Sequence, residues 1–395
     1  MKSQTNTRFT VLVYYAVFIF MGMVIASTGP LLPALTEKYQ VSLSQISLIF
    51  PANSLGYILS SFFGGRLYDH FKGHRILLLA LLLCVVMIVL IPAIASFWMV
   101  LAIYFILGLS TGGMDVGCNT LLVWKLREKA GPFMNGLHFF FGVGSFLVPL
   151  LISRAAIILG QPIRSYWFMA FAALPAALLL IRLPGPVMPP PPAMQTQTKT
   201  RANSLLILVL TFFFFLHVGA QICFGNWIYT YTLTTSSGSA NMAAYLNSAF
   251  WAAITVGRLL AIPVTMRVKT SSLLLGSLIG SVASILVVLI WPASPAALWI
   301  STIGVGLSLA TLYPSTLTYI GESMTLSGRI TGYLFVGGSL GGMILPWLIG
   351  QLFEPVGPLS AMVIPAAALL AALLVFVFLL RYLRQQTVKS SGQAG

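Results

Sequence analysis

Long apolar stretches dominate this chain and leave few folds open to it. Crossing the hydrocarbon core of a bilayer as an α-helix takes about 20 mostly apolar residues. Twelve such stretches follow one another along the sequence: 11–34, 45–65, 75–94, 97–124, 135–158, 165–183, 204–232, 243–264, 271–291, 297–320, 329–352 and 358–382. Because backbone groups in hydrocarbon need hydrogen bonds within their own segment, we predict an all-α membrane protein with 12 transmembrane helices.

The scarcity of charge agrees with a membrane fold. Only 7% of the 395 residues are charged, whereas about 25% are charged in soluble domains. A net charge of +15 would suggest nucleic acid in a soluble protein. Here the basic residues lie almost wholly between the apolar stretches. We therefore expect membrane lipids around the chain and no nucleic-acid partner.

The distribution of Lys and Arg predicts the topology. With the N-terminus in the cytoplasm, 18 of the 21 basic residues, Arg258 among them, fall on the cytoplasmic side, and Lys38, Arg154 and Arg164 on the other. Such an excess is the positive-inside pattern. We expect a bacterial cytoplasmic (inner) membrane protein with both termini in the cytoplasm. The first stretch is interpreted as a span and not as a cleaved signal peptide.

Short matches between the two halves of the sequence indicate an internal repeat. The residues at 65–67 recur at 257–259, and those at 108–110 recur at 306–308, always in the same order. A polar, Pro-rich stretch between the halves is typical of a flexible linker. We predict two pseudo-symmetric six-helix bundles at 1–183 and 204–395, joined by a cytoplasmic linker at 184–203.

Only one of the six acidic residues, Asp115, lies well inside a predicted span. A carboxyl group at that depth is costly, so it is a functional candidate. Asn119 lies one turn further on, on the same helix face. Two roles remain for Asp115, a proton-coupling site and a hydrogen-bonded structural acid, and we favour proton coupling. His70 and His74 belong to the connection after the second span, where we expect them to be solvated.

Amide, imidazole and aromatic side chains inside the spans are the candidates for binding a polar solute. Amides in hydrocarbon need hydrogen-bond partners, and aromatic faces with amides suit a sugar. Histidines can equally satisfy a neighbouring helix, and aromatic residues can belong to the membrane interface. Tyr313 lies 198 positions after Asp115, at the repeat offset. The predicted solute-binding residues are Asn53, Tyr57, Asn119, His138, His217, Gln221, Trp227, Tyr231, Asn247, Trp251 and Tyr313.

The connection GGRLYDHFKGHRILL resembles the signature loop of the major facilitator superfamily, with one extra residue between its Asp and second Gly. In that superfamily the loop locks the cytoplasmic side of the protein. The resemblance implies the superfamily fold. The predicted cytoplasmic gating residues are Gly65, Asp69, Gly73, Arg75 and Arg258.

Three further segments resemble the fucose:proton symporters and their sodium-dependent glucose transporter relatives: NGLHFFFGVGSFLVPLL, HVGAQICFGNW and LYPSTLTYIGE. Members of that group often carry an acid where Gln221 stands, and their acids in the fourth span couple to protons. The resemblance therefore implies sugar transport and assigns coupling to Asp115.

The leading hypothesis is a secondary transporter that moves a sugar or similar solute by alternating access, coupled to protons, with sodium as the alternative ion. An exporter of amphipathic compounds is the second hypothesis, since 26 Phe and 15 Met could line an apolar cavity. A receptor that binds its ligand in the central cavity of such a fold, without transporting it, is a third hypothesis. No hydrolase, metal-binding or nucleotide-binding motif is visible, so we expect no enzyme, cofactor or metal. A monomer suffices for this architecture.

Overall fold

The computed structural model describes residues 2–183, 185–186, 204–235, 239–323 and 328–392. In these residues all regular structure is helical, in agreement with the predicted fold class. The predicted linker at 184–203 lies outside the described residues except for residues 185 and 186.

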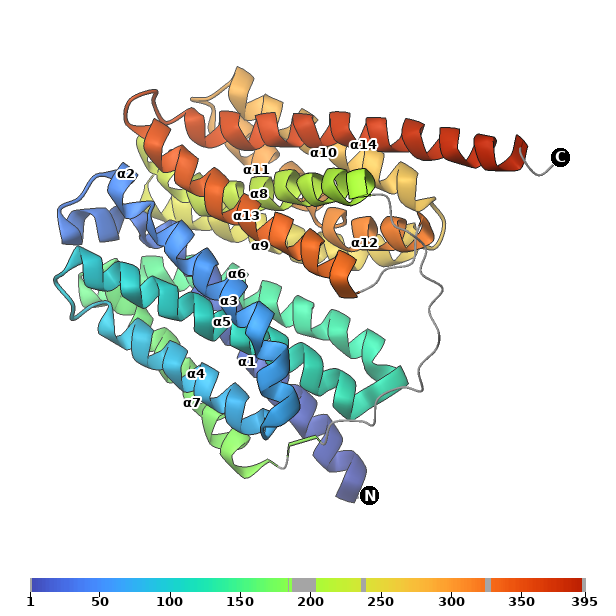
Figure 1. The fold of residues 1–395 in the computed structure, drawn as a ribbon. Helices are drawn as coiled ribbons and strands as arrows, with labels where there is room; N and C mark the ends of the chain where they lie inside the picture. Colours follow the sequence, from blue (N-terminus) through green and yellow to red (C-terminus); the bar gives the residue numbers. More distant parts are fainter. Residues whose placement is uncertain (1, 184, 187–203, 236–238, 324–327, 393–395) are drawn as a thin grey trace.

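Figure 1 shows two groups of helices, one built from each half of the chain. The first comprises α1 (Lys2–Tyr39), α2 (Leu43–Ile46), α3 (Ile49–His70), α4 (Gly73–Leu90), α5 (Phe97–Leu126), α6 (Ala130–Leu159) and α7 (Ser165–Arg182). The second comprises α8 (Ser204–Thr235), α9 (Ala240–Thr265), α10 (Thr270–Ile290), α11 (Pro295–Leu309), α12 (Leu312–Ser323), α13 (Gly328–Phe353) and α14 (Ser360–Gly392).

The number of membrane spans depends on how one long segment is divided. In the described residues, 11 helical segments are long and apolar enough to span a bilayer, and one of them, Phe97–Leu159, has 63 residues. As a single helix it would be about 95 Å long, about three times the hydrocarbon thickness. The backbone breaks at Arg127, whose φ is 51°. Since α5 and α6 are thus separate spans, the predicted number of 12 holds.

Two predicted helices differ in detail. The second span ends at His70 instead of residue 65, because the backbone N–H of Phe71 still donates to the Leu67 carbonyl at 3.0 Å. Asp69 therefore lies in the last turn of α3, and its predicted place in a loop is wrong. The tenth span is broken between α11 and α12. Pro314 has no N–H for the carbonyl four residues earlier, so it favours a break there.

Glycines allow close approach of corresponding helix pairs within each half. Gly22 and Gly144 lie between α1 and α6, and Gly219 and Gly341 lie between α8 and α13. At each of the four, an added Cβ would overlap the backbone of the facing helix. Small residues allow this approach in membranes. Both pairs are related by an offset of 197 residues, so the sequence repeat also appears in the packing.

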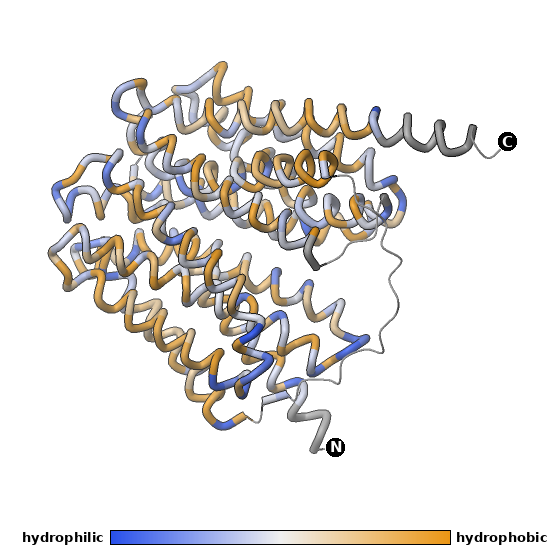
Figure 2. Tube along the Cα trace, in the orientation of Figure 1, coloured by the Kyte–Doolittle hydropathy of each residue, from blue (hydrophilic) through white to orange (hydrophobic). Residues whose placement is uncertain are grey.

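The two groups of helices meet at one end and separate toward the other (Figure 1). We call the meeting end, which carries α2 and the α13–α14 connection, the α2 end, and the other the linker end. The main contacts between the groups are α1 with α8, α2 with α13, α3 with α13, and α6 with α9. Figure 2 shows hydrophobic residues along most of each helix and hydrophilic residues concentrated at the turns. Large exposed side chains such as Phe62 and Phe171 form the apolar surface that a bilayer would cover.

Candidate functional site

Asp115 lies on α5, and both of its carboxylate oxygens have partners. The Tyr57 hydroxyl on α3 donates to Oδ2. Asn119 Nδ2, one turn along α5, donates to Oδ1 at 2.8 Å and to the Asp115 carbonyl at 2.8 Å. All three side chains are partly accessible. Donors on both oxygens stabilise the ionised carboxylate against the cost of its depth.

Close packing of α3 on α5 brings Tyr57 to Asp115. A Cβ at Gly108 would overlap the backbone carbonyl of Asn53, so the two helices touch one turn before Tyr57. At the same level Asn53 Nδ2 donates to the Tyr104 carbonyl at 3.2 Å. Asn53 thus uses its amide N–H to join two helices of one half.

Three polar residues from other helices complete this group. Tyr313, at the start of α12, is within electrostatic range of Asp115 and of Arg258 on α9. Arg258 is also within electrostatic range of His138 of α6. Tyr313 and Arg258 are partly accessible, and His138 is exposed. The five residues come from both halves of the chain, and we call Tyr57, Asp115, His138, Arg258 and Tyr313 the central polar group.

Arg258 is placed differently from the other predicted gating residues. It lies seven residues before the end of α9 at Thr265, well inside the helix. Within the described part of the chain, its guanidinium has no hydrogen bond and no ion pair. Sequence reasoning missed that it lies within electrostatic range of His138 and Tyr313. Its helical spacing from Trp251, seven residues, was the available signal.

A second cluster joins α8 to α9. Asn247 is fully buried, and its Nδ2 donates to the Gly225 carbonyl at 2.6 Å, while its Oδ1 has no partner among the described residues. Trp251, one turn on, packs edge to face against Phe141 of the other half, with ring centroids 6.3 Å apart. Its Nε1 also has no partner in the described structure. Gln221 is one turn before Gly225 and partly accessible. Buried polar atoms without partners call for an explanation.

Three other predicted solute-binding residues lie in packed surroundings. His217 is 1% exposed, with two phenylalanine rings of α8 at centroid distances of 5.0 Å. Trp227 Nε1 donates to the Pro346 carbonyl at 3.1 Å, and its ring stacks on Phe353. Tyr231 is fully buried further along α8. The structure does not bring these three residues to the central polar group.

The connection between α3 and α4 is short and lies at the linker end. Asp69 and Arg75 are exposed, and neither side chain makes an ion pair within the described residues. Gly65 is also open, since nothing lies within 4 Å of an added Cβ. At Gly73 an added Cβ would meet the side chain of Leu121. Of the predicted gating residues in this connection, only Gly73 is packed.

The prediction that His74 is solvated is wrong. This residue is 5% exposed. Its Nδ1 lies 3.0 Å from the Leu183 carbonyl and its Nε2 lies 2.7 Å from the Tyr14 hydroxyl. A carbonyl only accepts, so Nδ1 carries the hydrogen and the hydroxyl donates to Nε2. The neutral ring is thereby satisfied on both sides and joins α1, α4 and the end of α7.

The α2 end holds polar contacts between the halves that sequence reasoning missed. Gln351 Nε2 donates to the Ser44 carbonyl at 2.9 Å, and Ser44 Oγ donates to Gln351 Oε1 at 2.5 Å. The backbone N–H of Leu43 donates to Glu354 Oε1 at 3.0 Å. The capping box of α2 at Ser42 was visible as a sequence signal. Nothing in the sequence paired α2 with α13.

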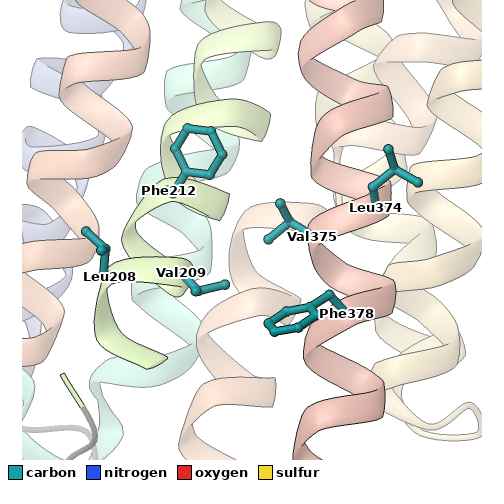
Figure 3. Close-up of a pocket in the computed structure, with 6 residues that line it drawn as sticks. All are labelled: Leu208, Val209, Phe212, Leu374, Val375 and Phe378. Carbon is teal, nitrogen blue, oxygen red and sulfur yellow. The ribbon is translucent and has the colours of Figure 1, made fainter. Parts of the chain in front are cut away.

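Two concave surfaces of the described structure are lined by residues outside the central polar group. One groove of about 560 Å³ runs between α8 and α14 and is lined by Leu208, Val209, Phe212, Leu374, Val375 and Phe378 (Figure 3). It offers no polar group to a solute. A second hollow of about 580 Å³ at the α2 end contains Glu37 and Glu354. Among the described residues, no three His, Cys, Asp or Glu side chains gather as metal ligands would.

Comparisons with known proteins agree on one family and one fold. The sequence profile of the Major Facilitator Superfamily matches residues 14–238. Sodium-dependent glucose transporter 1 of Rattus norvegicus is 33% identical over 386 residues, which cover 88% of this chain and 80% of the rat protein. A D-xylose-proton symporter structure aligns with a TM-score of 0.73 at 16% identity, covering 93% of this chain and 96% of that one. A Major Facilitator Superfamily transporter, FucP, in the outward conformation aligns with a TM-score of 0.64 at 17% identity, covering 94% of this chain and 99% of that one.

Proposed function

Because the chain belongs to the Major Facilitator Superfamily, we propose that it is a secondary transporter that carries a sugar across the membrane by alternating access, coupled to protons through Asp115. Its relatives are transporters and not enzymes, which agrees with the expectation from sequence. The similarity to a sodium-dependent glucose transporter supports a sugar as the solute. That relative's name also keeps sodium as the alternative ion.

The observation that carries the coupling proposal is the setting of Asp115. It is the one carboxylate deep in a span, its two oxygens accept from Tyr57 and Asn119, and Tyr313 of the other half is within electrostatic range. Proton binding would neutralise the carboxylate and weaken its charge-assisted hydrogen bonds. Since Tyr313 belongs to the other half, this change can alter how the halves attract one another.

The arrangement of contacts supports an inward-facing state. We place residues 1–183 and 204–395 as two rigid bundles, with the linker 184–203 and both termini in the cytoplasm of a bacterial cell. By the positive-inside pattern the α2 end then faces outward. That end is closed by the bonds of Gln351 and Glu354, while the central polar group stays accessible. Rocking of two such halves about a central site is the expected motion, and a monomer suffices.

Solute binding is assigned to both halves. Asn247 and Trp251 present polar atoms without partners in the described structure, and Phe141 of the first half packs against Trp251. Gln221, one turn before Gly225 on α8, is partly accessible. An amide next to aromatic faces suits sugar hydroxyls and ring C–H groups. The same polar lining argues against the alternative, an exporter of amphipathic compounds.

Uptake of radiolabelled hexose into proteoliposomes tests the proposal. An inward proton gradient should drive accumulation, and Asp115→Asn should abolish the response to that gradient. Glu128→Gln, which removes an exposed acid at the linker end, is the control and should behave as the unaltered protein. A separate sodium gradient distinguishes the two ions.

Two results would contradict parts of this proposal. If uptake ignores the proton gradient and Asp115→Asn matches the unaltered protein, coupling through Asp115 is wrong. If no hexose is taken up while lipophilic cations raise the melting temperature, the exporter alternative replaces sugar transport.

A further inference from the structure

Arg258 is a cation without a counter-charge in the interior of the bundle. It lies inside α9 and is partly accessible, and no carboxylate within the described residues forms an ion pair with it. The Asp115 carboxylate is already engaged by Tyr57 and Asn119. Water can solvate the guanidinium while the linker end is open. Closing that end would remove the water, and an unpaired charge is then expensive.

The polar groups within electrostatic range of Arg258 are hydrogen-bond donors. Tyr313 offers a hydroxyl and His138 a ring N–H, and both are within electrostatic range of the guanidinium. Neither carries negative charge at neutral pH. An anionic group bound to Arg258 would meet the guanidinium of α9, with the donors of α6 and α12 within electrostatic range. Such surroundings favour an anion over a neutral hydroxyl group.

One face of α9 connects this site to the second cluster. Asn247, Trp251 and Arg258 are spaced by four and seven residues, which places them on a common face. Trp251 and Arg258 are about 10 Å apart along the helix axis at 1.5 Å per residue. The face thus presents an amide oxygen and an indole N–H without partners in the described structure, then a guanidinium.

We propose that the transported solute is an acidic monosaccharide, whose ring packs at Trp251 and whose carboxylate is bound by Arg258. This inference rests on the proposed sugar transport and specifies its substrate class. A guanidinium matches a carboxylate in shape and offers two parallel hydrogen bonds. Its single charge balances one carboxylate, whereas a phosphate monoester carries about −1.5 to −2 at neutral pH.

Binding to the purified full-length protein tests the inference with three matched sugars, measured by isothermal titration calorimetry. D-Glucuronate carries the carboxylate, D-glucuronamide is its neutral isostere, and D-glucose is the neutral parent. We expect glucuronate to bind at least about tenfold more tightly than glucuronamide, as loss of one charge-assisted interaction would give. If glucose or glucuronamide binds as tightly as glucuronate, the acidic-substrate inference is overturned and sugar transport stands. If none of the three binds, the proposed sugar transport fails with it.

Variants of Arg258 locate the carboxylate. Arg258→Gln should weaken glucuronate binding by at least about thirtyfold, the lower range for truncating one member of a buried charge pair. It should leave glucuronamide binding unchanged, which also shows that the variant is folded. Arg258→Lys, which keeps the charge without the planar fork, should be intermediate. Arg66→Gln is the control, because Arg66 is the repeat counterpart and is exposed at the end of α3. If Arg258→Gln binds glucuronate normally, or loses all three sugars alike, the inference is wrong.

Discussion

Replacing Gln351 by Ala should weaken the closure of the α2 end. The variant loses the bond from Nε2 to the Ser44 carbonyl at 2.9 Å, the bond from Ser44 Oγ to Oε1 at 2.5 Å, and a longer bond from Nε2 to Ser47 Oγ at 3.2 Å. Each neutral hydrogen bond contributes about 0.5–1.5 kcal/mol net. Because Gln351 and Ser44 are partly accessible, we expect a loss of about 1–2 kcal/mol, which shifts the equilibrium toward the open α2 end about five- to thirtyfold.

This shift is large enough to be seen in a distance distribution. An open form populated at about 1% would rise to about 5–25%. Spin labels at Gln40 and Val356 report on the opening, because both residues are exposed, lie at the α2 end and belong to different halves. Double electron–electron resonance on Gln351→Ala should show a component at longer label-to-label distance that the unaltered protein lacks. The labels require a background in which the three buried cysteines are replaced.

A control variant separates the loss of the Gln351 hydrogen bonds from general destabilisation. Gln161→Ala removes an exposed amide near the same end, within the first half alone, and should leave the distribution unchanged. The contact between Leu43 and Glu354 remains in Gln351→Ala, so we expect a partial opening. Identical distributions for all three proteins would refute the idea that these bonds hold the end closed.

Three other changes probe the binding, coupling and packing assignments. Asn247→Ala should raise the KM for sugar uptake about tenfold with little change in kcat, since it removes binding that ground and transition states share; an unchanged KM would rule out solute contact. Tyr57→Phe removes one donor to Asp115, so gradient-driven uptake should fall while solute counterflow persists; an equal loss of both would point to solute binding instead. Gly341→Leu should destabilise the protein by about 1–3 kcal/mol through overpacking, because its Cβ would overlap the α8 backbone. A thermal melt measures this, and Gly276→Leu, where a Cβ meets nothing within 4 Å, should melt normally.

The spans and their order could be predicted because bilayer burial is a local constraint. Length and apolar content identify each helix without knowledge of its neighbours. The internal matches also predicted a repeated unit, and the glycines at 22, 144, 219 and 341 show the same repeat in the packing. The least certain places were helix ends. Asp69 illustrates this, because one further backbone bond at Phe71 extends α3 past the charged residues.

Helix rotation was not predictable to the same degree. In a span that is apolar on all sides, the pattern does not say which face meets the other half and which meets lipid. His217 and Trp227 share α8 with Gln221, yet they pack against Phe rings and the Pro346 carbonyl, while Gln221 stays partly accessible. His74 was misplaced because its partners, Tyr14 and Leu183, are far away in the sequence.

The sequence alone determined a twelve-span membrane protein of duplicated architecture, with one deep acid at Asp115. Only the tertiary structure decided which polar residues meet. It brings Tyr57 onto Asp115, puts Arg258 within electrostatic range of Tyr313 and His138, and closes the α2 end through Gln351. The physical reason is the sequence separation over which each feature is determined. Membrane insertion depends on the hydropathy of each segment by itself, whereas a polar contact between helices depends on the rotation and packing of segments up to 311 residues apart.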